Sequence, residues 1–245
     1  MSSIIKTKAF VLSKLDYGDS SKIVNFYSEK YGRVTGIIKG ARSSKSKVGK
    51  AVDLLNLVEL VFYKKENRDI QVVTQADLIE HFPNTKSDLE KLKYSSAILE
   101  LVLKLTLEDD PHPKLFVGLT KILKRINDEE TPTILLFALF LKFFINEIGY
   151  GIETEKCSEC QKPLLNSGKV HYNYELGFLC NSCEENHITS FNFSSELFSK
   201  IICLSQREKK CSYNDNELAS IITFFEKFLI YHIDEFKGLK SLQIY

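Results

Sequence analysis

The sequence of 245 residues is long enough for one large domain, or two to three small ones, with a hydrophobic core of its own. Hydrophobic residues make up 44% and charged residues 27%, the composition of an ordinary folded protein, which excludes a disordered chain. The net charge of +1 hides an asymmetry, because residues 1–80 hold 14 Lys and Arg against 9 Asp and Glu, whereas residues 81–245 hold 19 against 23.

A secretory leader and a membrane span are not expected. The N-terminus lacks the basic head and long apolar stretch of a secretory signal. The most apolar run, Ile134 to Ile145, has 12 residues and is interrupted by Lys142, whereas a membrane span needs about 20, so we expect a buried helix. Four of the six cysteines form CxxC pairs, and cytosolic thiols stay reduced, so we expect a cytoplasmic protein.

Residues 4 to about 80 form five extended runs separated by turns. In RVTGIIK, Val34, Gly36 and Ile38 alternate with the residues between them, the period of a half-buried strand. The last run, DIQVVTQADLI, is predicted to place four residues on one face: Ile70, Val72, Ala76 and Leu78. Five strands without a strong helical segment between them predict a small closed barrel.

After Pro83 the apolar residues take helical spacing. Ser87 is the expected N-cap of a first helix, with Glu90 three residues later. A third helix is predicted to begin with Thr131 as N-cap and Pro132 as its first residue, to end near Gly149, and to form the centre of a helical domain. The other predicted helices cover residues 114–126, 194–204 and 215–233.

Two CxxC pairs enclose a short polar segment. Each pair directs two sulfurs at one point, and 19 residues separate the pairs, a spacing used by zinc ribbons. Gly168 and Gly177 would allow two short hairpins between them. The pattern predicts one structural Zn²⁺ with all four ligand positions filled: Cys157, Cys160, Cys180 and Cys183.

Other interpretations of the cysteines and nearby histidines are less favoured. His171 and His187 are alternative ligands, but beside a complete set of four cysteines we interpret them as ordinary surface residues. A thioredoxin-like redox pair would need a CxxC at a helix start in a βαβ setting, which the sequence lacks. Cys203 is interpreted as a small buried hydrophobic residue.

A second concentrated signal is the segment KGARSSKSKVGK, residues 39–50. It is predicted to be a mobile loop unless a partner orders it, because it holds little apolar surface to bury. Phosphates are the natural partner, although a solvated loop that only aids solubility is the alternative. The segment holds five basic and no acidic side chains: Lys39, Arg42, Lys45, Lys47 and Lys50.

Neighbouring residues of the predicted barrel strengthen the nucleic-acid interpretation, because the open face of such barrels often binds single strands. Further candidate DNA contacts are Lys14, Lys22 and Arg33. Candidate stacking surfaces for bases are Tyr17, Phe26, Tyr27 and Tyr31.

The sequence offers little for an enzyme. No phosphate-binding loop, dinucleotide fingerprint, HExxH or GxSxG motif is present. Asp16 and Asp19 are better explained by a polar turn, and the five histidines are too scattered to suggest a triad. We therefore expect a protein without catalytic residues.

Three stretches have a distinctive order and content. They are AFVLSKLDYGDSSKIVNFYSEKYGRVTGIIKGAR near the N-terminus, FFINEIGYGIETEKCSECQKPL with ELGFLCNSC, and GLKSL near the C-terminus. Together they resemble the RecO family of bacterial recombination mediators, over essentially the whole chain. The chain departs from the family pattern at turn positions, with Gly151 where Pro is frequent, and Gln161 and Leu176 where Gly is frequent.

The resemblance implies an α+β multidomain protein. Residues 1–80 would form a five-stranded OB-fold barrel that binds DNA. Residues 81–245 would form an all-α domain with a four-cysteine, zinc-ribbon-like insert over residues 153–190.

The resemblance also implies a non-enzymatic role in DNA repair and homologous recombination, in the bacterial cytoplasm and at the nucleoid. Such proteins bind single- and double-stranded DNA, anneal complementary strands and, with RecR, help RecA to replace SSB on single strands. The alternative is a protein-binding zinc adaptor with only nonspecific nucleic-acid contact. A pocket for the acidic, apolar C-terminal tail of SSB would be rimmed by Lys121, Lys124, Arg125 and Lys142.

Overall fold

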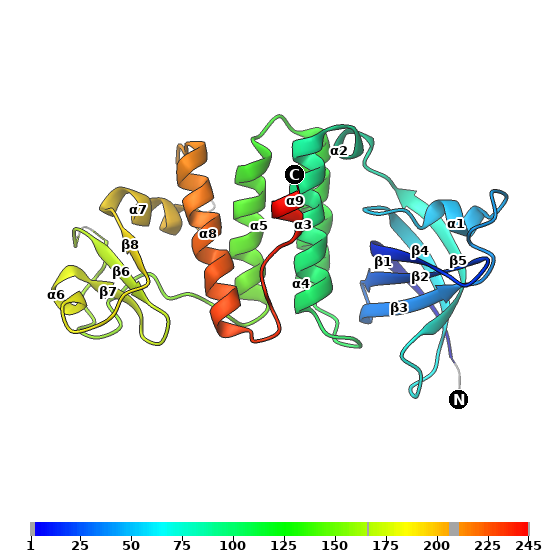
Figure 1. The fold of residues 1–245 in the computed structure, drawn as a ribbon, viewed down its shortest axis with the longest axis horizontal. Coiled ribbons are helices and arrows are strands. Elements are labelled where there is room, and N and C mark those ends of the chain that lie inside the picture. Colours follow the sequence, from blue (N-terminus) through cyan, green and yellow to red (C-terminus); the bar gives the residue numbers. More distant parts are fainter. Residues whose placement is uncertain (1–2, 166, 206–210, 245) are drawn as a thin grey trace. The chain divides into compact units, whose positions relative to one another are not determined.

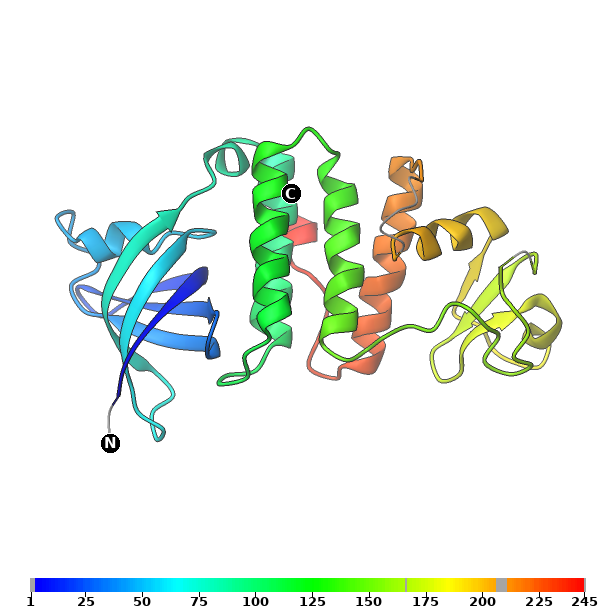
Figure 2. The same cartoon turned by 180° about the vertical axis from the view of Figure 1, so that it is seen from behind.

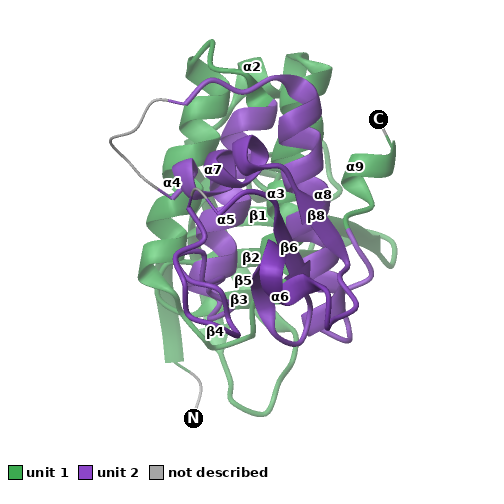
Figure 3. Cartoon of the chain, turned by 90° about the vertical axis from the view of Figure 1, so that its left-hand side faces the viewer, with its two compact units in different colours: residues 1–133, 239–245 green, residues 134–238 purple. Residues whose placement is uncertain are grey.

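The computed structural model describes residues 3–165, 167–205 and 211–244. The chain divides into two compact units (Figure 3). The first comprises residues 1–133 together with 239–245, and the second comprises residues 134–238. The chain therefore leaves the first unit once and later returns to it.

Five strands of the first unit form a closed barrel (Figures 1 and 2). They pair in the order β1-β2-β3-β5-β4, with β4 also paired to β1; β3 and β5 are parallel and the other pairs antiparallel. This is an OB-type barrel, so the predicted barrel is confirmed. The strands are β1 Ser3–Tyr17, β2 Ser21–Ser28, β3 Gly32–Ile38, β4 Leu57–Lys64 and β5 Gln71–Glu80.

The predicted alternation is confirmed in β3 and wrong in β5. Val34 and Ile38 are buried in the barrel core. In β5 the pairing shifts at an extra residue, Thr74, so that the buried positions change parity along the strand. Ile70 and Val72 therefore face away from the core, and Leu78 is exposed although it shares the parity of the buried Ala76. The buried side chains of β5 are Gln71, Val73 and Ala76.

Helices complete the first unit. The helix predicted to begin at Ser87 is α3, and its N-cap is Asp88 and not Ser87, because Asp88 Oδ1 accepts a hydrogen bond from Lys91 N at 2.9 Å. Phe116 packs with its ring centroid 5.6 Å from that of Phe10 and 6.4 Å from that of Tyr27, so this unit extends beyond residue 80. Its helices are α1 Lys47–Ala51, α2 Pro83–Ser87, α3 Leu89–Leu105, α4 Pro113–Asp128 and α9 Ser241–Ile244.

The second unit combines helices with a small sheet. The sheet has the strand order β7-β6-β8, and Phe224 of α8 lies within 5.0 to 5.7 Å, centroid to centroid, of rings from all three strands. This aromatic cluster fixes the sheet to α8. The elements are α5 Thr133–Glu147, β6 Val170–Asn173, β7 Gly177–Cys180, α6 Asn181–Glu184, β8 Phe191–Phe193, α7 Ser195–Cys203 and α8 Asp215–His232.

The apolar run at 134–145 is the buried helix α5, as predicted, but its start was predicted too early. Thr131 does not cap it, because the Thr131 hydroxyl donates to Glu129 Oε2 at 3.0 Å and the first helical residue is Thr133. The predicted end near Gly149 is confirmed, since Gly149 has φ of 90° just after the last turn. No helix among the described residues is long and apolar enough to cross a membrane.

Cys203 is buried, as predicted, but it is not a free thiol. It forms a disulfide with Cys211, with the two Cα atoms 6.5 Å apart. The bond joins residues close to the ends of α7 and α8. The sequence interpretation of Cys203 as a simple hydrophobic residue was therefore incomplete, because it gave Cys211 no role.

Candidate nucleic-acid interface and metal centre

The basic segment 39–50 is more than a loop, because part of it forms the helix α1 and it is anchored to the barrel. Ala41 and Val52 are buried in the barrel core, and Ser46 is the N-cap of α1, with its Oγ accepting from Gly49 N at 3.0 Å. Only glycine fits at position 49, because a Cβ there would lie 1.9 Å from the Ala41 carbonyl oxygen. The small apolar residues between the lysines anchor the segment to the barrel, a contribution that the charge pattern concealed.

Most of the basic side chains on this segment have no partner in the described part of the chain. Arg42 is the exception, since its guanidinium donates to the Gly18 carbonyl at 2.8 Å and lies 3.4 Å from Asp16 Oδ2, bracing the turn between β1 and β2. Among the residues that the structure describes, five predicted DNA contacts have no ion pair or side-chain hydrogen bond: Lys22, Lys39, Lys45, Lys47 and Lys50. These cations are available to an external anion.

Lys14 is neutralised within the barrel. Its Nζ lies 2.6 Å from Asp53 Oδ1, and Lys86 Nζ lies 2.9 Å from the other oxygen of the same carboxylate. Burial opposes ionisation of Asp53, but the hydrogen bonds from the two lysines lower its pKa to about 2. Lys14 is thus less available for phosphate than the five unpaired lysines.

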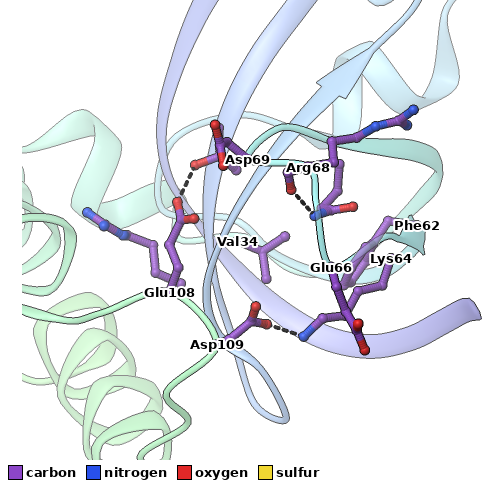
Figure 4. A pocket seen from close by; sticks show the side chains of 11 residues that line it. Val34, Phe62, Lys64, Glu66, Arg68, Asp69, Glu108 and Asp109 are labelled. Atoms are coloured by element: carbon purple, nitrogen blue, oxygen red, sulfur yellow. Dashed lines mark hydrogen bonds and ion pairs between the residues drawn. The ribbon is translucent and has the colours of Figure 1, made fainter. Parts of the chain in front are cut away.

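Arg33 joins the barrel to the segment that follows α3. Its Nη1 donates to the Leu103 carbonyl at 2.8 Å, and its backbone N donates to the Leu107 carbonyl at 3.3 Å. Figure 4 shows the adjoining pocket, where Lys64 pairs with Asp109. The pocket lining carries four carboxylates against three basic groups, which does not favour a phosphate: Glu66, Asp69, Glu108 and Asp109 against Arg33, Lys64 and Arg68.

Only one of the four candidate stacking residues is well exposed. Phe26 and Tyr27 are fully buried, so their prediction as base-stacking surfaces is wrong. Phe26 lies in the barrel core, and Tyr27 is covered by Phe116 of α4. Tyr31 is half-buried, with the Lys64 ammonium 4.7 Å from its ring centroid. Tyr17 remains, with 55% of its surface exposed.

A strip of aliphatic residues on the outer face of the barrel was not predicted from the sequence. Leu15 pairs with Ile23, Ile23 with Ile37, and Ile37 with Val72, so the four lie side by side across β1, β2, β3 and β5. Leu15 is 67% exposed, and the others are half-buried. Each residue has the outward parity of its own strand, but the strip emerges only once the strand register is known.

The four predicted rim residues of the SSB-tail pocket are divided between the two units. Lys124 lies 3.0 Å from Glu80, and Arg125 lies 2.9 Å from Glu129. Lys121, on the same helix α4, has no such partner among the described residues. These three belong to the first unit, whereas Lys142 lies on α5 in the second.

Lys142 is unusual because it is only 5% exposed and has no ion pair within the described part of the chain. Its Nζ lies 5.7 Å from the ring centroid of Phe225. Burial lowers its pKa to about 8, partly opposed by the charge of Glu153. A buried ammonium without a counterion is a favourable contact point for a carboxylate.

The four cysteines of the CxxC pairs meet at one point. Their Sγ atoms all lie within 4.8 Å of one another, and those of Cys160 and Cys180 are 3.7 Å apart. The cluster contains the only group of three or more potential metal ligands of this compactness among the described residues. The predicted convergence of Cys157, Cys160, Cys180 and Cys183 is therefore confirmed.

The chemistry of this cluster fits a thiophilic metal ion. Burial opposes ionisation of Cys157, but backbone N–H groups of Cys160 and Cys180 lower its pKa to about 6. A thiolate is the form that binds a metal, and Cys157 is the cysteine that favours it, whereas burial and the three neighbouring thiols raise the pKa of Cys183. Four sulfur ligands suit Zn²⁺ in a closed, tetrahedral site that leaves no position for a substrate.

Of the two nearby histidines, His171 is not an ordinary surface residue, contrary to the sequence interpretation, whereas His187 is partly exposed. His171 is buried, and its Nδ1 lies 2.7 Å from Asn192 Oδ1. His187 Nε2 lies 3.0 Å from Glu159 Oε2. Neither belongs to the sulfur cluster, so the prediction that they are not ligands agrees with the geometry.

Together these features define a protein with an OB-type barrel that carries unpaired lysines, followed by helices and a four-cysteine, metal-binding insert. The profile described as "Recombination protein O N terminal" matches residues 1–82, and that described as "Recombination protein O C terminal" matches residues 86–243. The chain belongs to the RecO family of DNA repair proteins.

Individual relatives match at similar levels of identity. The DNA repair protein RecO of Chloroherpeton thalassium is 30% identical over 99% of this chain and 98% of its own length. That of Chlorobaculum parvum is 33% identical over 67% of this chain and 63% of its own. That of Clostridium novyi is 29% identical over 75% of this chain and 70% of its own.

Proposed function

We propose that this protein binds single- and double-stranded DNA and anneals complementary strands, without enzymatic activity. The observation that carries the proposal is a set of five lysines on the barrel that have no partner among the residues the structure describes: Lys22, Lys39, Lys45, Lys47 and Lys50. Each phosphate that such a cation neutralises releases counterions, which favours binding to DNA of any sequence.

Annealing follows from the same charges. Two DNA strands repel each other through their phosphates, and a strand whose phosphates are neutralised accepts a second strand more readily. Base pairing then supplies the driving free energy. The aliphatic strip beside Tyr17 offers an apolar surface for the bases of a single strand, whereas duplex DNA would use the lysines alone.

The wider role that we propose is loading of RecA, together with RecR, onto single strands covered by SSB, in the cytoplasm and at the nucleoid. Capture of the acidic, apolar SSB tail would bring the protein to such strands. Lys142 supports this step, since a buried, unpaired ammonium beside Phe225 suits a terminal carboxylate next to an aromatic residue. Lys121 on α4 is a second available cation.

The metal centre is proposed to be a structural Zn²⁺ site. Four sulfur ligands would fill all the tetrahedral positions of the ion, so it would fix the insert and take no part in chemistry. The insert is a poor surface for DNA, because residues 153–190 carry six Glu and three Lys and no other charged side chain apart from histidine. We therefore propose that the insert contributes to folding and not to DNA binding.

The DNA-binding proposal is tested by reversing charge on the basic segment. Lys45, Lys47 and Lys50 are changed together to Glu, and Lys162, Lys169 and Lys227, exposed lysines of the second unit, are changed together as a control. Affinity for a fluorescent single strand is measured over a range of salt. The salt slope should fall by about 2 for the first variant, since each lost phosphate contact removes about 0.7.

The control should keep the wild-type slope and affinity. Equal affinity and slope in the wild type and the Lys45, Lys47 and Lys50 variant at low salt would refute the assignment of this surface. Strand annealing with SSB-coated complementary oligonucleotides, before and after removal of the metal, tests the wider role.

A further inference from the structure

The two CxxC turns of the metal centre each have a histidine beside them that is not a ligand. His187 contacts Glu159, which lies between Cys157 and Cys160. His171 Nε2 lies 3.4 Å from the side-chain oxygen of Asn181, which lies between Cys180 and Cys183. Each histidine therefore holds an intervening residue of one metal-binding turn.

The two turns differ in how firmly the backbone holds them. In the first turn, Cys157 N donates to the Lys162 carbonyl at 2.9 Å, and Gln161 N donates to the Cys157 carbonyl at 3.0 Å. Ser158 N also donates to the Phe178 carbonyl of β7 at 2.9 Å. Backbone bonds therefore fix this turn to itself and to the sheet, and the Gln161 side chain adds a bond to the Ser158 carbonyl at 3.3 Å.

The second turn has fewer such supports. It forms α6, a helix of only four residues, and no side chain caps the N-terminus of that helix. Cys180 is held by strand pairing with Val170, but Cys183 lies beyond the strand, at the third residue of α6. Its position depends on how α6 lies against the sheet.

His171 is placed to control that position. It lies on β6, the central strand of the sheet, and is 5% exposed. Its Nδ1 is 2.7 Å from Asn192 Oδ1 of the neighbouring strand β8, and Thr189 Oγ1 donates to the same oxygen at 3.2 Å. Its Nε2 faces Asn181, and its Nδ1 is 3.8 Å from the carboxylate of Glu184, both on α6.

We infer that His171 is a positioning residue of the metal centre, which ties α6 to the sheet and so brings the Cys183 sulfur to the other three. Both ring nitrogens are already engaged, which leaves neither for the metal. Partners of this kind, outside the ligand shell, typically change metal affinity by about 10- to 100-fold when they are removed. This inference rests on the proposed metal site.

His187 provides a matched comparison. It makes one contact, to Glu159 on the turn that the backbone already holds, and its side chain is 28% exposed. We expect its loss to change metal affinity by less than about 3-fold, since exposed pairs of this kind contribute little. The contrast between the two histidines separates a positioning role from a general effect of removing a histidine near the site.

The test measures metal binding by the full chain. Zn²⁺ affinity is determined by competition with a chromophoric chelator, and Co²⁺ spectra report the geometry of the four sulfurs. The variants are His171→Phe, His171→Gln and His187→Gln. The Phe variant should bind Zn²⁺ at least about 10-fold more weakly and show altered Co²⁺ bands, and the Gln variant, which keeps hydrogen-bonding groups, should recover part of the loss.

Affinity and Co²⁺ bands of His171→Phe equal to those of the wild type would overturn the inference, as would an equal loss in His187→Gln. If His171→Phe does not fold, Asn192→Ala removes the support of His171 from β8 and leaves both turns intact, and the same weakening is expected there. A wild-type chain that binds neither Zn²⁺ nor Co²⁺ would instead refute the metal centre itself.

Discussion

Replacing Glu100 by alanine should release residues 239–245 from the first unit. Glu100 lies on α3 and is largely buried, with only 12% of its side chain exposed. One of its oxygens accepts from Lys240 N at 3.0 Å and the other from Ser241 N at 2.8 Å. Lys104 lies 2.6 Å from the same carboxylate. These are the groups that begin α9.

The size of the effect follows from these contacts. A hydrogen bond to a charged acceptor contributes about 1.5–3 kcal/mol, and the freed N–H groups regain bonds to water, so the lower end applies to each. The ion pair with Lys104, which is partly exposed, adds little. The two bonds together give about 3 kcal/mol, which raises the detached population of the segment about 100-fold.

Amide hydrogen exchange at Lys240 and Ser241 measures this population directly, and trypsin cleavage after Lys240 provides a second measurement. Both should be about 100-fold faster in Glu100→Ala, with a smaller change in Glu100→Gln, which keeps one acceptor oxygen. Glu235→Gln, an exposed change, is the control. Exchange and cleavage at wild-type rates in Glu100→Ala would refute the reasoning.

The same contact should weaken in acid. Burial raises the pKa of Glu100, but the bonds from Lys104, Ser241 and Lys240 outweigh it and hold the pKa below the ordinary value of 4.5. A lowered folded-state pKa means that the stabilisation is complete above the unfolded pKa and is lost as the pH falls through the folded one. The protection of the Ser241 amide, relative to an unprotected amide at the same pH, should therefore fall below about pH 4.5 in the wild type but not in Glu100→Ala.

Three further predictions concern other sites. Gln161→Gly should stabilise the metal-loaded insert by about 1 kcal/mol, measured by thermal unfolding, because Gln161 has φ of 60°, a conformation that costs a residue with a side chain about that much. The free energy of unfolding should fall as the pH drops from about 4 through about 2, because Asp53 becomes protonated there. The Asp53→Asn variant should lack this pH dependence, and a dependence retained in that variant would contradict the role of Asp53. Removal of the metal by a chelator should abolish protection from hydrogen exchange in β6 and β7 while β1 to β5 stay protected, and loss of protection in both would show that the insert is not an independent folding unit.

Features that depend on local spacing could be predicted from the sequence. The convergence of Cys157 and Cys160 follows from a two-residue turn, and the alternation in β3 follows from the period of a strand. The apolar helix α5 and the order of elements depend on equally local patterns. These signals involve residues a few positions apart, which interact in the same way in any folded chain.

Features that depend on partners far away in the sequence could not be predicted. Lys14 is paired by Asp53, 39 residues away, and Tyr27 is covered by Phe116 of α4. The basic character of Lys14 and the aromatic character of Tyr27 are visible in the sequence, but their availability is decided by segments that fold over them. The face of β5 was wrong for a different reason, because the extra residue Thr74 changes the buried parity within the strand, so that no single alternation fits both Val73 and Ala76.

The return of residues 239–245 to the first unit has a consequence for synthesis on the ribosome. The barrel and helices α2 to α4 are made first and can begin to fold early, as N-terminal domains generally do. Glu100, however, cannot find its partners until Lys240 and Ser241 have emerged, after the whole second unit has been translated. The unit that starts to fold first is therefore completed last. In a nascent chain stalled within the metal-binding insert, the Glu100 carboxylate would keep Lys104 as its partner but would lack the two backbone N–H groups.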